Sequence, residues 1–174
     1  LNSKKLKFIF FGKDSLDILS YQDIFSRVNE HNISIIINCA AYTNVDDSET
    51  KKKLAYELNC KAIENIVKIC KLKKIYLIHF STDYVFDGNK LNYKETNKTN
   101  PINYYGKTKK IGEQIITKKL NAFVIFRLSW LIGNYSNNFL KTIYLYLKKE
   151  KKLSMVNDQI NNPTTTVLVS RVVK

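Results

Sequence analysis

Short apolar runs alternate with longer amphipathic stretches along most of this 174-residue chain. The runs are rich in β-branched and aromatic residues, which favours strands, whereas the stretches between them have the helical period. This alternation is typical of repeated βα units over a parallel sheet. We expect strands at 7–11, 33–38, 75–80, 123–128 and 153–156, and helices from Ser20 to about Asn29, from Ser48 to about Leu72, from Asn103 or Tyr104 to about Lys119, and from about Asn138 to Lys149. Ser20 and Asp23, three residues apart, predict a capping box.

Polar loop residues concentrate at 81–103, directly after the run at 75–80. In an open α/β sheet, ligands bind outside the carboxyl ends of the strands. We therefore expect this loop to converge on the functional site with the loops that follow Asn38 and Leu128.

Composition excludes several classes of protein. The net charge of +14 raises nucleic acid as a partner, but nearly all the basic residues are lysine, and base and phosphate readers favour arginine. A solvated basic surface is the preferred interpretation. The three cysteines include no Cys-x-x-Cys pair and no suitably spaced histidine, which argues against a disulfide framework or a metal site and favours a reducing cytoplasm. The apolar runs are too short to span a membrane.

A possible catalytic pair is Tyr105 and Lys109, which lie four residues apart on one face of a predicted helix. A free phenol titrates near ~10, so a nearby ammonium would help it transfer a proton at neutral pH. The same spacing is also common on ordinary amphipathic helices. Here, however, Ser81 and Thr82 end the preceding strand, and a hydroxyl beside a tyrosine acid suits polarisation of a carbonyl during hydride transfer.

Several motifs together resemble the extended short-chain dehydrogenase/reductases and, among them, the dTDP-4-dehydrorhamnose reductase family. The matching segments occur in family order across nearly the whole chain: Ile37-Asn-Cys-Ala-Ala-Tyr-Thr-Asn-Val-Asp46, Glu57-Leu-Asn59, the stretch 79–88 containing Ser-Thr-Asp-Tyr-Val-Phe-Asp-Gly, Asn103-Tyr-Tyr-Gly-Lys-Thr-Lys109, Arg127-Leu-Ser-Trp130, Asn137-Asn-Phe139 and Asp158-Gln-Ile-Asn-Asn-Pro-Thr164.

The resemblance implies a Rossmann-like, doubly wound parallel sheet and a cytoplasmic oxidoreductase of dTDP-rhamnose and polysaccharide biosynthesis. The enzyme would use NADPH or NADH to reduce the 4-keto group of dTDP-4-dehydro-L-rhamnose and would form a homodimer. Tyr105 would donate the proton, Lys109 would lower its pKa and hold the nicotinamide ribose, Thr82 would bond the substrate carbonyl, and Asn59 would support a proton-relay water. Further cofactor contacts would come from Asp17, Ile18, Ala40, Ala41, Tyr42 and Thr43, and substrate contacts from Thr82, Asp83 and Trp130.

Single residues also have simpler interpretations. Trp130 could be a core aromatic, Asp17 could cap a turn, and Asn59 could be a solvated helix residue. His79, within an apolar strand, and His31, in a loop, are both interpreted as structural.

The chain departs from the family pattern at its start. The glycine-rich turn that brings a backbone close to a pyrophosphate is missing, and Gly12 lies only 26 residues before Asn38, which leaves room for one βα unit. We therefore interpret residues 7–11 as the family's second strand, with the first βα unit lacking. Residues 1–150 would form an incomplete NAD(P)-binding domain, and 151–174 the start of a substrate domain.

Two expectations follow from this departure. Gly12-Lys13, in place of an acidic residue, predicts a preference for NADPH, and the chain alone is expected not to bind NAD(P)H saturably. A non-catalytic binding or regulatory subunit is the alternative to an enzyme, and nucleic-acid binding through the basic surface is a third hypothesis.

Overall fold

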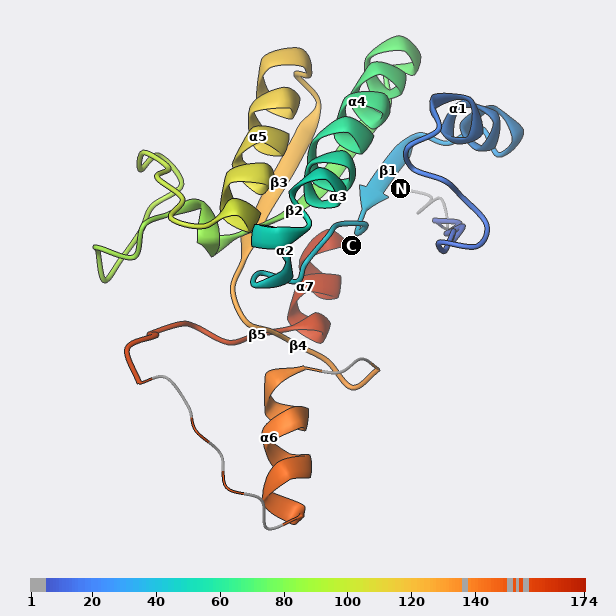
Figure 1. Cartoon of the computed structure of the whole chain (residues 1–174). Coiled ribbons are helices and arrows are strands. Elements are labelled where there is room, and N and C mark those ends of the chain that lie inside the picture. Colours follow the sequence, from blue (N-terminus) through green and yellow to red (C-terminus); the bar gives the residue numbers. More distant parts are fainter. Residues whose placement is uncertain (1–5, 136–137, 150–151, 153, 155–156) are drawn as a thin grey trace.

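The computed structural model describes residues 6–135, 138–149, 152, 154 and 157–174, and its centre is a three-stranded parallel sheet (Figure 1). The strands are β1 (Ile35–Asn38), β2 (Tyr76–Thr82) and β3 (Phe123–Leu128), in the order β1-β2-β3. In register, Ile36 lies beside Leu77, and Leu77 beside Phe123. The predicted α/β fold with a parallel sheet is confirmed, with these strands within two residues of their predicted bounds.

The main core lies between this sheet and three helices, α1 (Tyr21–Glu30), α4 (Ala62–Lys73) and α5 (Tyr104–Lys119), which stand side by side in Figure 1. Helix α4 connects β1 to β2, and α5 connects β2 to β3. Because successive parallel connections have the same hand, both helices cover the same face of the sheet. The buried core residues come from all these elements and include Ile24, Val28, Ile63, Val67, Leu77 and Ile116.

The long helix predicted from Ser48 to Leu72 is divided. It consists of α2 (Asp47–Thr50), α3 (Lys52–Tyr56), a π-helical turn η1 (Glu57–Lys61) and α4. The break after α2 occurs at Lys51, whose backbone is not helical (φ −92, ψ 45). The wide turn η1 occurs where Asn59 bonds to another segment, which agrees with the tendency of π-turns to mark functional sites.

The C-terminal third is a looser assembly. Strands β4 (Leu131–Ile132) and β5 (Thr164–Thr165) pair in parallel, and α6 (Phe139–Lys148) and α7 (Thr166–Val173) have no buried residue. Helix α6 was predicted, from about Asn138 to Lys149. The prediction did not include strands β4 and β5 or helix α7. A strand of two residues is too short to show a hydrophobic period.

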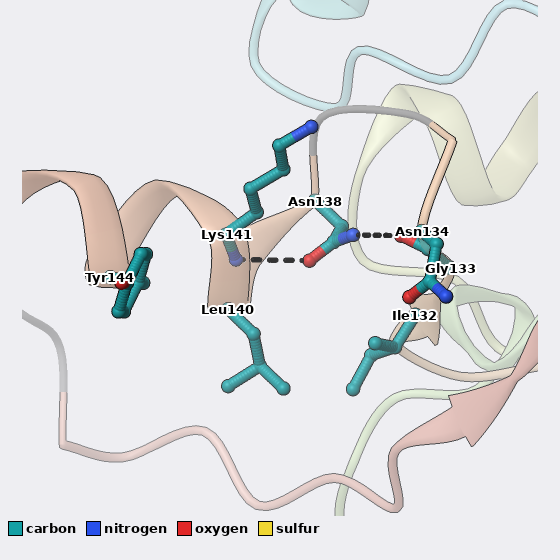
Figure 2. Close-up of a pocket in the computed structure, with 7 residues that line it drawn as sticks. All are labelled: Ile132, Gly133, Asn134, Asn138, Leu140, Lys141 and Tyr144. Carbon is teal, nitrogen blue, oxygen red and sulfur yellow. Dashed lines mark hydrogen bonds between the residues drawn. The ribbon is translucent and has the colours of Figure 1, made fainter.

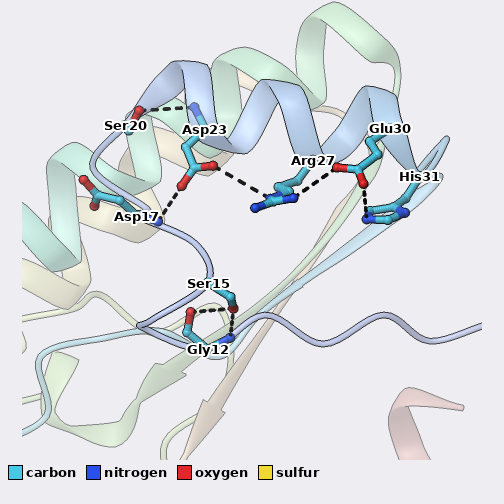
Figure 3. A network of polar contacts seen from close by, with 8 residues as sticks. All are labelled: Gly12, Ser15, Asp17, Ser20, Asp23, Arg27, Glu30 and His31. Atoms are coloured by element: carbon cyan, nitrogen blue, oxygen red, sulfur yellow. Dashed lines mark hydrogen bonds and ion pairs between the residues drawn. The ribbon is translucent and has the colours of Figure 1, made fainter.

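Two sequence expectations for the N-terminal region are wrong. Residues 6–12 form no strand, because among the described residues no strand lies beside them to complete a ladder, and Phe10 is 87% exposed. The capping box at α1 is only half formed: the Ser20 hydroxyl accepts from Asp23 N at 3.1 Å, but the Asp23 carboxylate accepts from Asp17 N instead (Figure 3). The strand expected at 153–156 falls outside the described residues.

The three parallel strands all point the same way, so their carboxyl ends, at Asn38, Thr82 and Leu128, lie at one edge of the sheet. The predicted convergence of the three following loops is therefore confirmed. Among the described residues, no helix has both the length and the apolar character needed to cross a membrane.

Candidate active site

The Thr82 hydroxyl lies at the end of β2, where the chain enters the 3-10 turn η2 (Asp83–Val85). It is buried, accepts from Tyr84 N at 3.2 Å and donates to Asp83 Oδ1 at 3.1 Å. The phenol of Tyr105, in the first turn of α5, is also buried, and the neighbouring Thr82 hydroxyl lowers the phenol's pKa. Burial is the larger effect, so the pKa of Tyr105 is raised and the side chain is a protonated donor at neutral pH.

Gly106 allows the first turn of α5 to pack directly against η2. A Cβ at this position would lie 2.1 Å from the carbonyl oxygen of Tyr84, which is far inside van der Waals contact. The start of the helix is fixed by Asn103, whose side chain accepts from Gly106 N at 2.7 Å. Tyr105 is therefore held next to Thr82 by the backbone as well as by its own contacts.

Lys109 lies one turn further along α5, also buried and on the same face as Tyr105, as predicted. Its ammonium donates to the carbonyl oxygen of Phe80 at 2.7 Å. Burial lowers the pKa of Lys109 to about 8, an effect that the nearby Glu113 carboxylate opposes. The expected lowering of the Tyr105 pKa by Lys109 is not present in this structure, because the ammonium is directed at β2 and burial of the phenol dominates.

Asn38 and His79, at adjacent register positions on β1 and β2, form a buried pair with Asn38 Nδ2 3.1 Å from His79 Nδ1. The Asn38 side-chain oxygen accepts from Ala40 N at 3.1 Å, so its amide nitrogen is the donor to the ring. Burial and the charge of Lys109 lower the pKa of His79 to about 3. His79 is thus neutral, and its hydrogen bond orients the side chain of Asn38. Asn38 in turn holds the start of the loop 39–43 through Ala40 N.

Asn59, on the π-turn η1, fastens the other end of that loop. Its side chain accepts from Tyr42 N at 2.9 Å and donates to Tyr42 O at 3.0 Å and to Thr108 Oγ1 at 2.9 Å. Gly112 permits this packing, because a Cβ there would lie 2.7 Å from Asn59 O. Both amide hydrogens of Asn59 are used within the protein, so its side chain positions the loop, and the role in supporting a relay water remains a prediction.

The remaining predicted cofactor residues divide into two groups. Ala40 and Thr43 are exposed and Ala41 and Tyr42 half-buried at the carboxyl edge of the sheet, close to the residues above. Asp17 (Figure 3) and Ile18 lie in the turn before α1. The Asp17 carboxylate accepts from Leu19 N at 2.9 Å. Within the described part of the chain, the hydrogen bonds of this turn reach α1 and α4 but not the loop 39–43.

Trp130, the predicted substrate contact, follows β3 with a left-handed backbone (φ 40), an unusual conformation for a bulky residue. Its ring packs against Phe139, with centroids 4.6 Å apart. The segment after it borders a pocket of about 460 Å³. The lining residues combine apolar side chains with amides and an ammonium: Ile132, Leu140, Tyr144, Asn134, Asn138 and Lys141 (Figure 2).

Sequence reasoning missed Asn38 and treated His79 as structural. Both residues lie near the carboxyl ends of predicted strands, and this position was the sequence signal that could have pointed to their contact. It also missed the buried ion pair of Arg127 with Glu113, at 2.7 Å, which joins β3 to α5 behind Lys109. Arg127 also donates to the carbonyl of Glu95 and so holds the loop after β2.

The parallel sheet, with its covering helices and the polar cluster at its carboxyl edge, defines a Rossmann-like α/β protein. More particularly, the chain belongs to the RmlD substrate binding domain family, whose profile matches residues 1–174. A dTDP-4-dehydrorhamnose reductase of Aggregatibacter actinomycetemcomitans is 39% identical over 150 residues, which are 86% of this chain and 51% of that protein.

Solved structures give the same assignment. A Bacillus anthracis dTDP-4-dehydrorhamnose reductase in complex with NADP superimposes with a TM-score of 0.91 at 38% identity, over 99% of this chain and 63% of that one. A Clostridium acetobutylicum counterpart also gives 0.91, at 35% identity, over 99% of this chain and 61% of that one. The chain spans about half the length of the curated relatives it matches.

Proposed function

We propose that this chain carries the catalytic centre of an NAD(P)H-dependent reductase that converts the 4-keto group of dTDP-4-dehydro-L-rhamnose to the alcohol of dTDP-L-rhamnose. The observation that carries the proposal is the burial of Thr82, Tyr105 and Lys109 together at the carboxyl edge of β2. The family membership and the names of the relatives support the choice of substrate.

The residues present fit the nicotinamide end of the cofactor. The loop 39–43 is held at the sheet edge by Asn38 and Asn59, and Lys109 is a buried donor against the Phe80 carbonyl of β2. Lys109 and Tyr105 would hold the nicotinamide ribose, with Ala40 to Thr43 alongside. When bound, the cofactor supplies a hydride to the carbonyl carbon of the sugar.

The chain's own residues would handle the oxygen of that carbonyl. Thr82 would turn its hydroxyl from Asp83 to the substrate and polarise the carbonyl. Tyr105, kept protonated by its raised pKa, would give its proton to the oxygen as negative charge develops. Lys109, with a pKa of about 8, would then stabilise the phenolate.

Other features of the proposal follow the family. We place the enzyme in the cytoplasm, in dTDP-rhamnose and polysaccharide biosynthesis, as a possible homodimer without a nucleic-acid partner. Residues 1–150 would serve the cofactor and 151–174 would begin the substrate domain. The pocket of Figure 2 would receive part of the nucleotide sugar. Asp83 and Trp130 would also contact this substrate.

The test is a tyrosine substitution in a protein that joins this chain to the flanking segments of its Bacillus anthracis relative. Tyr105→Phe should lower turnover of the keto sugar by roughly 10²-fold or more, because a positioned proton donor contributes at least that much. Tyr104→Phe, the same change one residue earlier, is the control and should keep turnover within a few-fold. Near wild-type turnover in Tyr105→Phe would contradict the proposal.

Lys109→Met tests the lysine separately. We expect lower turnover and an activity optimum moved to higher pH, because the phenolate loses its neighbouring cation. An unchanged pH profile would contradict the role given to Lys109.

A further inference from the structure

Asn161 lies between Asp83, which follows β2, and Trp130, which follows β3, although it is far from both in sequence. Its amide nitrogen donates to Asp83 Oδ2 at 2.7 Å, and its amide oxygen accepts from Trp130 Nε1 at 2.7 Å. The orientation follows from the neighbours, since a carboxylate can only accept and an indole N–H can only donate. Asn161 therefore bridges two groups that no other single residue type of its size could satisfy together.

The bridge continues to the catalytic hydroxyl. The second Asp83 oxygen, Oδ1, accepts from Thr82 Oγ1 at 3.1 Å, and the Thr82 hydroxyl lies next to the phenol of Tyr105. A series of hydrogen bonds thus runs from the Thr82 hydroxyl through Asp83 and Asn161 to the indole of Trp130. The carboxylate of Asp83 also helps to raise the pKa of Tyr105, so its position affects the proton donor.

Residues 161–164 also help to hold the backbone of Trp130 in a strained conformation. A left-handed backbone at a non-glycine residue is strained and persists only where the surroundings impose it. Here Thr164 N donates to Trp130 O at 3.2 Å, Asn161 holds the indole N–H, and Phe139 packs against the ring. Two of these three restraints come from residues 161–164.

We propose that Asn161 is a positioning residue that sets the separation and orientation of Thr82 and Trp130 on the acceptor side of the site. This inference rests on the proposed function for the identity of the acceptor, an uncharged keto sugar ring that lies between the hydroxyl and the indole. Asn161 touches neither the reacting carbon nor the cofactor. It acts by fixing two groups. One is the Asp83 carboxylate, which orients the Thr82 hydroxyl, and the other is the Trp130 indole, which would form the opposite wall of the sugar site.

The test uses Trp130 itself, because it is the only tryptophan in the chain and its fluorescence reports this site alone. Asn161→Asp keeps the acceptor for the indole but replaces the donor to Asp83 by a second carboxylate, so the bridge should open. In the 174-residue chain at sub-micromolar concentration, we expect the Trp130 emission to shift to longer wavelength as the ring becomes more exposed. Asn162→Asp makes the same charge change at an exposed neighbour and should leave the emission unchanged.

A double variant distinguishes loss of the Asn161 bridge from a general loss of structure. In the double variant Asp83→Asn with Asn161→Asp, the amide and the carboxylate exchange places and can bond again, so the emission of the unsubstituted chain should return. Circular dichroism of each variant shows whether the fold is intact. If Asn161→Asp fails to fold, recovery in the double variant still supports the bridge.

Three results would overturn the inference: unchanged emission in Asn161→Asp, an equal shift in Asn162→Asp, or no recovery in the double variant. None of these measurements depends on a reaction, so they are distinct from a failure of the proposed function. In the joined protein, Asn161→Asp should raise the KM for the keto sugar several-fold and leave the KM for NADPH unchanged. An equal rise in both KM values would also count against a role on the acceptor side.

Discussion

Lys109 and His79 are buried ionisable side chains on the same side of the sheet, and the fold favours the neutral form of both. Desolvation is the main cause for each, and the lysine charge adds to the effect on the histidine. The two groups have different uses. With a pKa of about 8, Lys109 still carries its proton near neutral pH and donates to the Phe80 carbonyl, whereas a pKa of about 3 keeps His79 neutral and a hydrogen-bond acceptor for Asn38.

The lowered pKa of His79 predicts acid sensitivity. The ordinary value is 6.5 and the folded-state value about 3, so as pH falls below 6.5 the unfolded chain takes up a proton that the folded chain does not. The stability that His79 contributes is present above pH 6.5 and is lost toward pH 3, at up to about 1.4 kcal/mol per pH unit.

Denaturant unfolding at several pH values would measure this effect. His79→Gln should show a shallower loss of unfolding free energy between pH 6.5 and 3 than the unsubstituted chain. His31→Gln, which removes the half-exposed histidine at the end of α1, should keep the original slope. Equal slopes for all three proteins would contradict the assignment.

Among the elements, η2 and α5 form the contact that brings the hydroxyls of Thr82 and Tyr105 together, and this contact depends on a glycine. An alanine at 106 would normally stabilise a helix by about 1 kcal/mol. Here its Cβ would meet the Tyr84 carbonyl at 2.1 Å, and backbone atoms cannot yield as a flexible side chain can. Packing, and not helix propensity, therefore decides whether an alanine at 106 stabilises or destabilises the fold.

Gly106→Ala should lower the free energy of unfolding by about 1–3 kcal/mol, the usual range for overpacking in a close contact. Chemical denaturation measures the change. Gly12→Ala is the control, since nothing lies within 4 Å of a Cβ at that position. A Gly106→Ala protein as stable as the original would show that α5 can move away from η2 without cost.

The turn after residues 7–11 carries the prediction on cofactor choice. Gly12 and Ser15 close it, with Gly12 N donating to Ser15 Oγ at 2.9 Å, and Lys13 is exposed within it (Figure 3). In the joined protein we expect a higher kcat/KM for NADPH than for NADH, because a cation here would attract the 2′-phosphate. Lys13→Met should reduce that ratio, and a several-fold preference of the joined protein for NADH would refute the prediction.

At the scale of the whole molecule, apolar surface and unpaired backbone are exposed in several places. Among the described residues, the outer edge of β1 pairs with no strand, and α6 and α7 have no buried side chain. Phe8 and Phe10 are exposed as well. Exposed strand edges and apolar patches are typical sites of association.

The 174-residue chain expressed alone should therefore self-associate, as sedimentation at a series of concentrations would show. Ile35→Lys places a charge on the exposed β1 strand and should shift the distribution toward monomer. Leu72→Lys, at an exposed leucine near the end of α4, should have little effect. A concentration-independent monomer for the unsubstituted chain would contradict this prediction.

The sequence alone determined the local elements and the placement of Tyr105 and Lys109 on one helix face. Strands β1, β2 and β3 and helices α1, α5 and α6 follow from hydrophobic period and caps, which neighbouring residues carry. The face shared by Tyr105 and Lys109 follows from helical spacing alone.

Tertiary structure decided everything that depends on segments distant in sequence. Residues 7–11 have the pattern of a strand but form none, because a strand requires a partner edge. The Asn38 contact with His79 depends on the register of two strands, and the Asn161 bridge on where a remote loop is placed. The raised pKa of Tyr105 and the lowered pKa of Lys109 likewise arise from burial, and burial is a property of the packed molecule that no local pattern encodes.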